Sequence, residues 1–140
     1  MAFEAGKGAV LKLDDSAGTL TDISAYLTNV DFPQEVVVVE TTAFGKTSRE
    51  FVVGLKNATI SLSGHWDGAA SAIDALLNGI LGTATTKTFE YGPHGSATGD
   101  IRYTGESILT RYGVVAAVEG GVDFTADLQV SGAVTRNTFP

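Results

Sequence analysis

Few residues of this chain combine the type and the spacing that chemistry requires. Gly45-Lys46-Thr47 resembles the end of a phosphate-binding loop, but that motif needs a glycine five residues before Gly45, where Glu40 stands. A serine-hydrolase elbow around Ser96 would need a glycine where His94 lies, and no strand-to-helix turn is indicated after it. We therefore expect neither a nucleotide site nor a nucleophilic serine.

The sequence also lacks a metal-binding pattern. His65 and His94 lie far apart in the chain, and there is no cysteine to supply a thiolate ligand, a disulfide or a nucleophile. Asp14 and Asp15 are adjacent, so on a strand their side chains would point to opposite faces. The sequence predicts no metal, no cofactor and no enzyme activity.

The composition favours one folded, β-rich domain over residues 1–140. Hydrophobic residues make up 44% of the chain and charged residues 18%, with 17 glycines and 3 prolines. A formal charge of −7 opposes an attractive grip on nucleic-acid phosphates. Neither a signal segment nor the roughly 18 consecutive apolar residues of a membrane span occur, so we expect a soluble protein without membrane insertion.

Alternation of apolar and polar residues predicts the strands. The clearest pattern runs over residues 122–130, and a second covers 56–67. Four consecutive valines at 36–39 are typical of a strand covered on both faces. The alternation slips near Gly105, which indicates a β-bulge.

One helix is predicted, at 70–81, because apolar residues there follow the 3.6-residue period. Strands precede and follow it, and this order predicts an antiparallel β-sandwich or barrel with one flanking α-helix. Residues 1–8 are expected to form a flexible N-terminal arm. Residues 41–50 are polar and small, and they are expected to form the tip of a long hairpin.

The apolar residues exceed what one sandwich with a wet outer face usually needs. A well-filled core is one explanation, and burial against other copies of the chain is the other. The candidate subunit-packing residues are Val36, Val37, Val38, Val39, Ile73, Leu76, Leu77 and Ile80.

Several features occur in a particular order along nearly the whole chain. They are an N-terminal arm, a valine-rich hairpin with a polar tip that includes Thr42-Ala43-Phe44-Gly45, a strand ending Leu62-Ser63-Gly64-His65-Trp66-Asp67, one helix, and long closing strands. This order resembles the major tail tube protein of bacteriophages with long, non-contractile tails. That family has no catalytic motif to compare.

The resemblance implies a virion protein that forms hexameric rings, stacked into a hollow tail tube through which DNA passes during ejection. It implies assembly in the bacterial host cytoplasm, a fold shared with contractile-tail and type VI secretion tubes, and a tape-measure protein and tail-end proteins as further partners. If six subunits lend four strands each, the inner barrel has a backbone diameter of about 48 Å, wide enough for duplex DNA.

The resemblance implies roles for two polar segments. The candidate lumen-facing residues are Asp123, Thr125, Asp127 and Gln129, which alternate with the apolar face of 122–130. Six copies at −7 would carry −42 per ring, so DNA would pass without specific binding. The candidate inter-ring contact is the hairpin tip, which comprises Phe44, Gly45, Lys46, Thr47, Ser48, Arg49 and Glu50.

Alternatives stay open at this point. A tail-completion, terminator or connector protein of the same virion would share the fold but form a single ring. A β-sandwich binding module would normally show clustered aromatic residues with polar partners, whereas Trp66 lies on the predicted core face. For residues 123–129, the plain alternative is an ordinary solvated outer face.

Overall fold

Residues 5–140 fold into eight strands and one short α-helix. The computed structural model describes residues 5–140, so residues 1–4 of the expected arm lie outside the described part. The strands are β1 Val10–Asp14, β2 Leu20–Asp22, β3 Leu27–Asp31, β4 Gln34–Glu40, β5 Phe51–His65, β6 Lys87–Gly92, β7 Ile101–Ala116 and β8 Val122–Thr138. The helical elements are η1 Gly6–Gly8, η2 Ser24–Tyr26 and α1 Ile73–Ile80.

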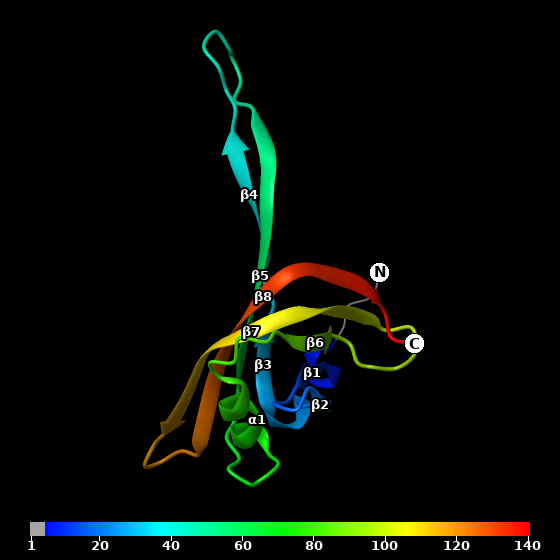
Figure 1. The fold of residues 1–140 in the computed structure, drawn as a ribbon, viewed down its shortest axis with the longest axis vertical. Coiled ribbons are helices and arrows are strands. Elements are labelled where there is room, and N and C mark those ends of the chain that lie inside the picture. The colour runs from blue at the N-terminus through cyan, green and yellow to red at the C-terminus, as the bar shows by residue number, and fades with distance from the viewer. Residues whose placement is uncertain (1–4) are drawn as a thin grey trace.

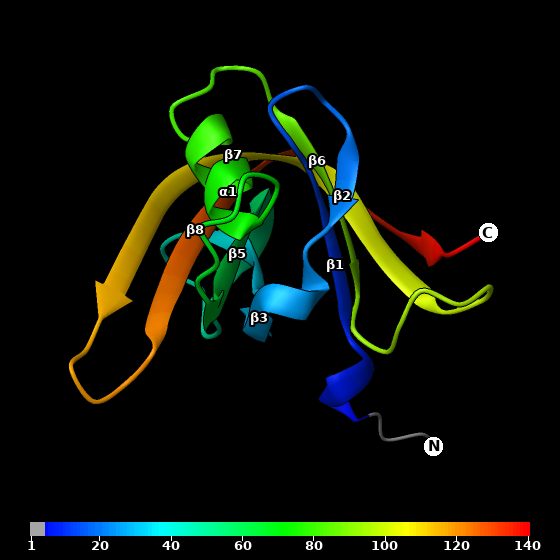
Figure 2. The same cartoon turned by 90° about the horizontal axis from the view of Figure 1, so that it is seen from below.

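All strands belong to one antiparallel, strongly curved sheet. Its order is β2-β1-β6-β7-β8-β5-β3, and β4 pairs with β5. In Figure 2, β7 arches over α1, so the sheet curves around the helix. Leu13 of β1 and Leu62 of β5, from opposite parts of the sheet, belong to the same buried cluster. The predicted mainly β, antiparallel architecture with one flanking helix is confirmed, with a single bent sheet enclosing the core.

Strand β8 lies inside the sheet, between β7 and β5, and its alternation gives it one buried face. Phe124, Ala126 and Leu128 are fully buried, and the intervening side chains point the other way. The predicted bulge at Gly105 is confirmed, since β7 and β8 shift register between Thr104 and Glu106. The bulge bends β7 and β8 as they cross the molecule.

Helix α1 is shorter than the predicted span of 70–81. Ala72 has an extended backbone, with φ −93° and ψ −170°, so the helix begins only at Ile73. The chain turns away after Ile80, and the left-handed φ of +81° at Gly82 suits a glycine at this end. Asp74 fastens the helix to the sheet by accepting hydrogen bonds from Trp66 Nε1 at 3.2 Å and Tyr112 Oη at 2.7 Å.

The hairpin of β4 and the first half of β5 projects from the rest of the molecule (Figure 1). Valines 36–39 on β4 are 46–58% exposed. The expectation that this run is covered on both faces is therefore not met within the subunit, because only β5 lies beside it. Among residues 5–140, no helix is long and apolar enough to cross a membrane.

Candidate assembly surfaces and channel face

The candidate channel face is the polar side of β8. Asp123, Thr125, Asp127 and Gln129 all lie on the side opposite the buried residues of that strand, as predicted. The register places His65 of β5 beside Asp123 and Ser63 of β5 beside Thr125. The four side chains therefore share one surface with the polar side chains of His65 and Ser63.

The charges on this surface are partly paired with each other. His65 Nδ1 lies 3.0 Å from Asp123 Oδ1, and Arg111 Nη1 of β7 lies 3.8 Å from Asp127 Oδ2. Gln129 Nε2 donates to Asn57 Oδ1 at 2.7 Å. All of these groups except Gln129 are well exposed, so the pairs contribute little to stability. The pair of Arg111 and Asp127 affects the charge of this surface, because the carboxylate of Asp127 offsets the positive charge of Arg111.

A second polar cluster lies on the sheet, and the sequence did not predict it. Arg102 of β7 donates to Glu90 Oε1 at 2.8 Å and to Asn137 Oδ1 at 2.9 Å. The Phe139 ring lies 5.6 Å from the Arg102 guanidinium and 5.9 Å from Lys12 Nζ. No local pattern could have revealed this cluster, because only the strand register brings these residues together. In this cluster the basic side chains of Arg102 and Lys12 both have close partners within the subunit.

The candidate subunit-packing residues separate into two groups. Valines 36–39 are accessible on the projecting hairpin. Ile73, Leu77 and Ile80 are at most 1% exposed and pack in the subunit's own core, while Leu76 is half-buried against it. The three buried helix residues therefore have no surface left for a neighbouring subunit. Of the eight candidate residues, only the hairpin valines and part of Leu76 remain accessible for a contact between subunits.

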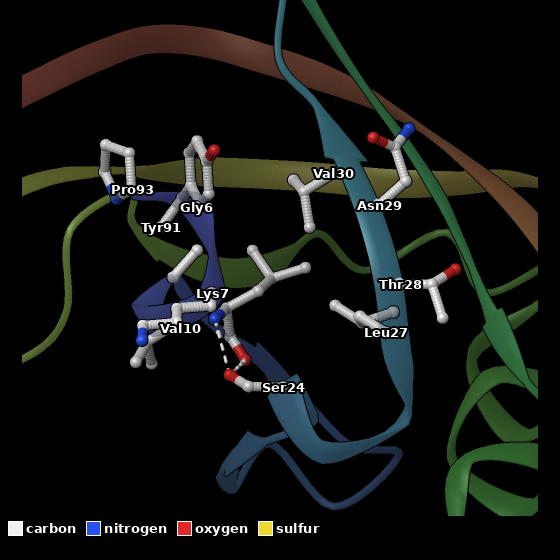
Figure 3. A pocket seen from close by; sticks show the side chains of 12 residues that line it. Gly6, Lys7, Val10, Ser24, Leu27, Thr28, Asn29, Val30, Tyr91 and Pro93 are labelled. Atoms are coloured by element: carbon white, nitrogen blue, oxygen red, sulfur yellow. Dashed lines mark hydrogen bonds between the residues drawn. The ribbon is translucent and has the colours of Figure 1, made fainter. Parts of the chain in front are cut away.

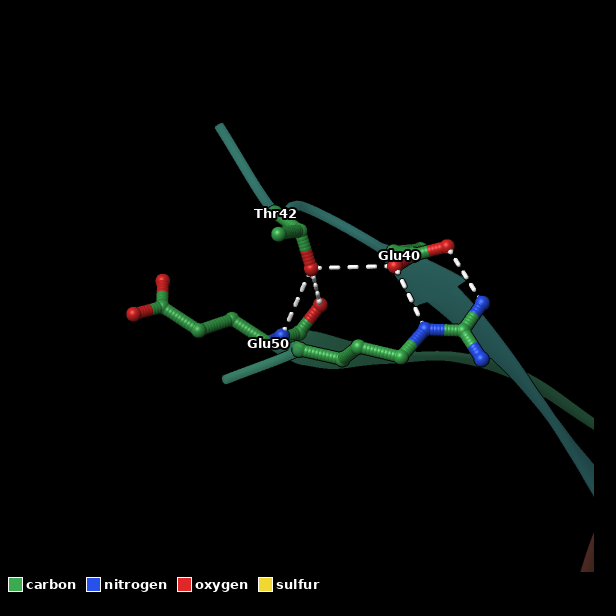
Figure 4. A network of polar contacts seen from close by, with 4 residues as sticks. Glu40, Thr42 and Glu50 are labelled. Atoms are coloured by element: carbon green, nitrogen blue, oxygen red, sulfur yellow. Dashed lines mark hydrogen bonds and ion pairs between the residues drawn. The ribbon is translucent and has the colours of Figure 1, made fainter. Parts of the chain in front are cut away.

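The base of the hairpin tip is held by a polar network (Figure 4). Arg49 donates to both carboxylate oxygens of Glu40, at 2.9 and 3.0 Å. Thr42 Oγ1 donates to Glu40 Oε2 at 3.0 Å and accepts from the Glu50 backbone N–H at 2.8 Å. The Arg49 guanidinium lowers the pKa of the Glu40 carboxyl below its ordinary value. This network therefore fixes the base of the tip, where the tip residues extend beyond the ends of β4 and β5.

The tip itself presents one apolar side chain among polar ones. Phe44 is fully exposed, and Lys46 Nζ forms an exposed ion pair with Glu50 Oε1 at 3.3 Å. Gly45 has a left-handed φ of +84°, which a glycine adopts without strain. The seven predicted tip residues, 44–50, thus lie together between β4 and β5. Nothing within the described chain covers the Phe44 ring.

A cleft of about 520 Å³ lies between β1 and β3. In Figure 3, Leu27 and Val30 project from β3 toward β1. The Ser24 hydroxyl in this cleft accepts from the Leu11 backbone N–H at 2.8 Å and donates to Asp22 Oδ1 at 2.6 Å. It is therefore engaged in holding the chain. Residues 5–140 contain no cluster of three or more side chains that could hold a metal ion.

Exposed apolar hairpins on a well-packed sheet are the features of a structural protein that assembles with other chains. The chain belongs to the phage tail tube protein family, whose model it matches over residues 4–136. This confirms the resemblance, and it makes the protein a structural, non-enzymatic component of the virion tail that forms the tail tube. No curated protein matches the chain by sequence.

Solved structures show the same fold in related assemblies. The tail of an empty gene transfer agent particle, in C6 symmetry, matches with a TM-score of 0.81 and 19% identity, covering 97% of this chain and 100% of that one. The SPP1 tail tube matches with a TM-score of 0.78 and 13% identity, covering 97% and 80%. The sheath/tube terminator of the PVC extracellular contractile injection system matches with a TM-score of 0.73 and 11% identity, covering 99% of both chains.

Proposed function

We propose that six copies of the chain form a ring, that rings stack into the tail tube, and that DNA passes through the bore without specific binding. The observation that carries this proposal is the projecting hairpin of β4 and β5. Valines 36–39 and, on the paired strand, Phe51, Val52, Val53 and Leu55 are exposed in the single subunit. Such a continuous apolar surface is typical of an interface between chains. The six-fold symmetry of the similar gene transfer agent tail supports a ring of six.

The polar side of β8 is the part of the subunit assigned to the bore. Asp123 and Asp127 are its acids, and its other predicted residues, Thr125 and Gln129, are uncharged. Arg111 lies beside Asp127, so the one arginine on this part of the sheet is close to an acid. Phosphates passing such a surface would meet repulsion rather than a row of free cations.

The remaining partners follow from a tube of defined length with two different ends. A tape-measure protein occupies the tube during assembly in the host cytoplasm, and tail-end proteins cap it. The hairpin tip at 44–50 reaches the neighbouring ring. These roles rest on the family and on the position of the tip at one end of the long axis (Figure 1).

Electron microscopy of the purified protein tests the ring and the tube together. Wild-type protein is expected to form six-membered rings and hollow tubes. Val37→Asp combined with Val39→Asp places charges on the exposed hairpin and is expected to abolish rings while the subunit stays folded. Leu20→Asp, on the exposed part of β2, is the matched control and is expected to assemble normally. A wild-type protein that remains a monomer at high concentration would overturn the proposal.

A tail terminator is the second candidate, since the terminator of a contractile injection system shares the fold. A terminator forms one ring at the end of a tube, whereas a tube protein polymerises. The same micrographs separate the two functions, because isolated rings at every protein concentration support a terminator and long tubes support the tube protein.

A further inference from the structure

The two most exposed large apolar side chains lie at opposite ends of the molecule. Phe44, at the tip of the β4–β5 hairpin, is 108% exposed, and Val118, in the turn between β7 and β8, is 104% exposed. Figure 1 shows the β4–β5 tip at the top and the β7–β8 turn at the lower left, near the other end of the long axis. No other large apolar side chain in the described part of the chain exceeds 84%.

The charges beside these two apolar side chains are opposite. Lys46 follows Phe44 by two residues, and its only ion pair with residues 5–140 is the exposed one with Glu50 at 3.3 Å. Glu119 follows Val118 directly, is exposed, and has no ion pair or side-chain hydrogen bond with residues 5–140. One turn therefore presents an aromatic ring with a cation, and the other presents a valine with an unpaired acid.

Both turns are positioned by paired strands. Residues 41–50 begin and end at the Glu40, Thr42 and Arg49 network. The β7–β8 turn is closed by the pair Ala116↔Val122 and by a hydrogen bond from the Gly120 N–H to the Ala117 carbonyl at 3.3 Å. Because the strands hold both turns away from the core, each can meet another chain without unfolding.

We infer that Phe44 and Lys46 of one copy dock on Val118 and Glu119 of a copy in the next ring. The inference rests on the proposed function, and it names the receiving surface for the hairpin tip. A tube grows head to tail, so its axial contact joins two different surfaces on opposite ends of the same chain. These two turns meet that requirement, with apolar contact between Phe44 and Val118 and charge attraction between Lys46 and Glu119.

A charge swap tests the polar half of this contact. Lys46→Glu and Glu119→Lys should each give rings that no longer stack into long tubes, because like charges then face each other. The double variant Lys46→Glu/Glu119→Lys should recover long tubes, because the attraction is restored with its direction reversed. Thermal melts of the unassembled subunits check that all three variants are folded. Double-variant tubes as short as those of the worse single variant would contradict the contact.

Disulfide trapping tests the position of the contact, and the chain has no cysteine to interfere. In oxidised tubes of Ala43→Cys/Val118→Cys, each chain links to one above and one below, so a covalent ladder longer than six chains should form. Each single variant should give no more than a dimer. The matched control is Ala43→Cys/Ala84→Cys, whose second cysteine lies on the exposed loop after α1, and it should give no ladder.

The outcomes separate this inference from the proposed function. Wild-type protein that forms no tubes counts against the proposed function. Wild-type tubes combined with no ladder from Ala43→Cys/Val118→Cys, or with a ladder from the Ala84 control instead, overturn the inference alone. A ladder that stops at six chains would place this contact within a ring and would also overturn it.

Discussion

Leu77 is apolar, like the hairpin valines, but it is completely buried within one subunit. It packs in the core cluster between α1 and the sheet. Leu77→Ala should therefore destabilise the isolated subunit by about 2–5 kcal/mol, because it leaves a cavity that the surroundings fill only partly. Denaturant unfolding of the unassembled protein measures the change.

Leu81→Ala is the control for this substitution, since Leu81 is 42% exposed at the end of the same helix. It should cost much less stability than Leu77→Ala. A Leu77→Ala subunit as stable as the wild type but unable to form rings would instead place Leu77 in an interface between subunits.

The Tyr112 hydroxyl is expected to make the stability of the subunit depend on pH in the alkaline range. Burial, aided by the hydrogen bond to Asp74, raises the pKa of Tyr112 from 10.0 to about 12. Above pH 10 the unfolded tyrosine loses its proton while the folded one keeps it, so stability should fall as pH rises from 10 toward 12. Tyr112→Phe should make this fall shallower in unfolding measurements across that range.

Trp66→Phe provides the comparison, because it removes the other hydrogen bond to Asp74 but no titrating group. It should lower stability at neutral pH but retain the fall in stability above pH 10, because Tyr112 stays in place and the Trp66 side chain only lowers the pKa of Tyr112. An unchanged alkaline slope in Tyr112→Phe would show that Tyr112 does not contribute to it.

The hairpin is the element that serves assembly rather than the stability of the subunit. Its tip lies outside the core and is joined to the strands through the Glu40–Arg49 pair and Thr42. Replacing residues 43–48 by a two-residue turn should leave a folded subunit, since the removed residues bury nothing in the core. It should also abolish long tubes, which electron microscopy would reveal directly.

In a second variant, glycine and serine replace residues 43–48 at the original length. This variant separates the effect of the length of the tip from the effect of its side chains. Short tubes from both variants would mean that the tip side chains matter. Normal tubes from the shortened variant would exclude any role of the tip between rings.

Net charge is a property of the whole assembly, because each subunit's −7 is repeated around the ring. Asp123→Lys combined with Asp127→Lys changes each subunit by four charge units but should disturb the fold little, since both carboxylates are exposed. If this face lines the bore, the tubes should bind duplex DNA in a salt-dependent way, and virions built from them should eject DNA slowly or incompletely. Co-sedimentation over a range of salt concentrations measures the binding.

The neutral variant Asp123→Asn/Asp127→Asn makes half of this charge change and should give weaker binding with a smaller salt dependence. Charge-reversed tubes that bind no DNA, or carboxylates found on the outer wall of the tube, would remove residues 123–129 from the channel.

The sequence by itself determined which face of each long element is apolar. The alternation over 122–130 appears in the structure from Phe124 onward, with Val122 exposed, and the helical stripe before Gly82 and the slip at Gly105 appear where they were predicted. These features are local, because a strand repeats every two residues and a helix every 3.6, whatever lies nearby. The tip at 41–50 was predictable for the same reason, as a polar break between two apolar runs.

Only the tertiary structure decided what covers each apolar face. Valines 36–39 and the stripe of Ile73, Leu77 and Ile80 were equivalent candidates for contact between subunits, yet the valines are exposed and the stripe is buried in the subunit. Hydrophobic burial has no direction of its own, so the pattern states that a face must be covered but not by what. The covering partner is set by sheet order and register, which join residues as distant as Lys12 and Phe139.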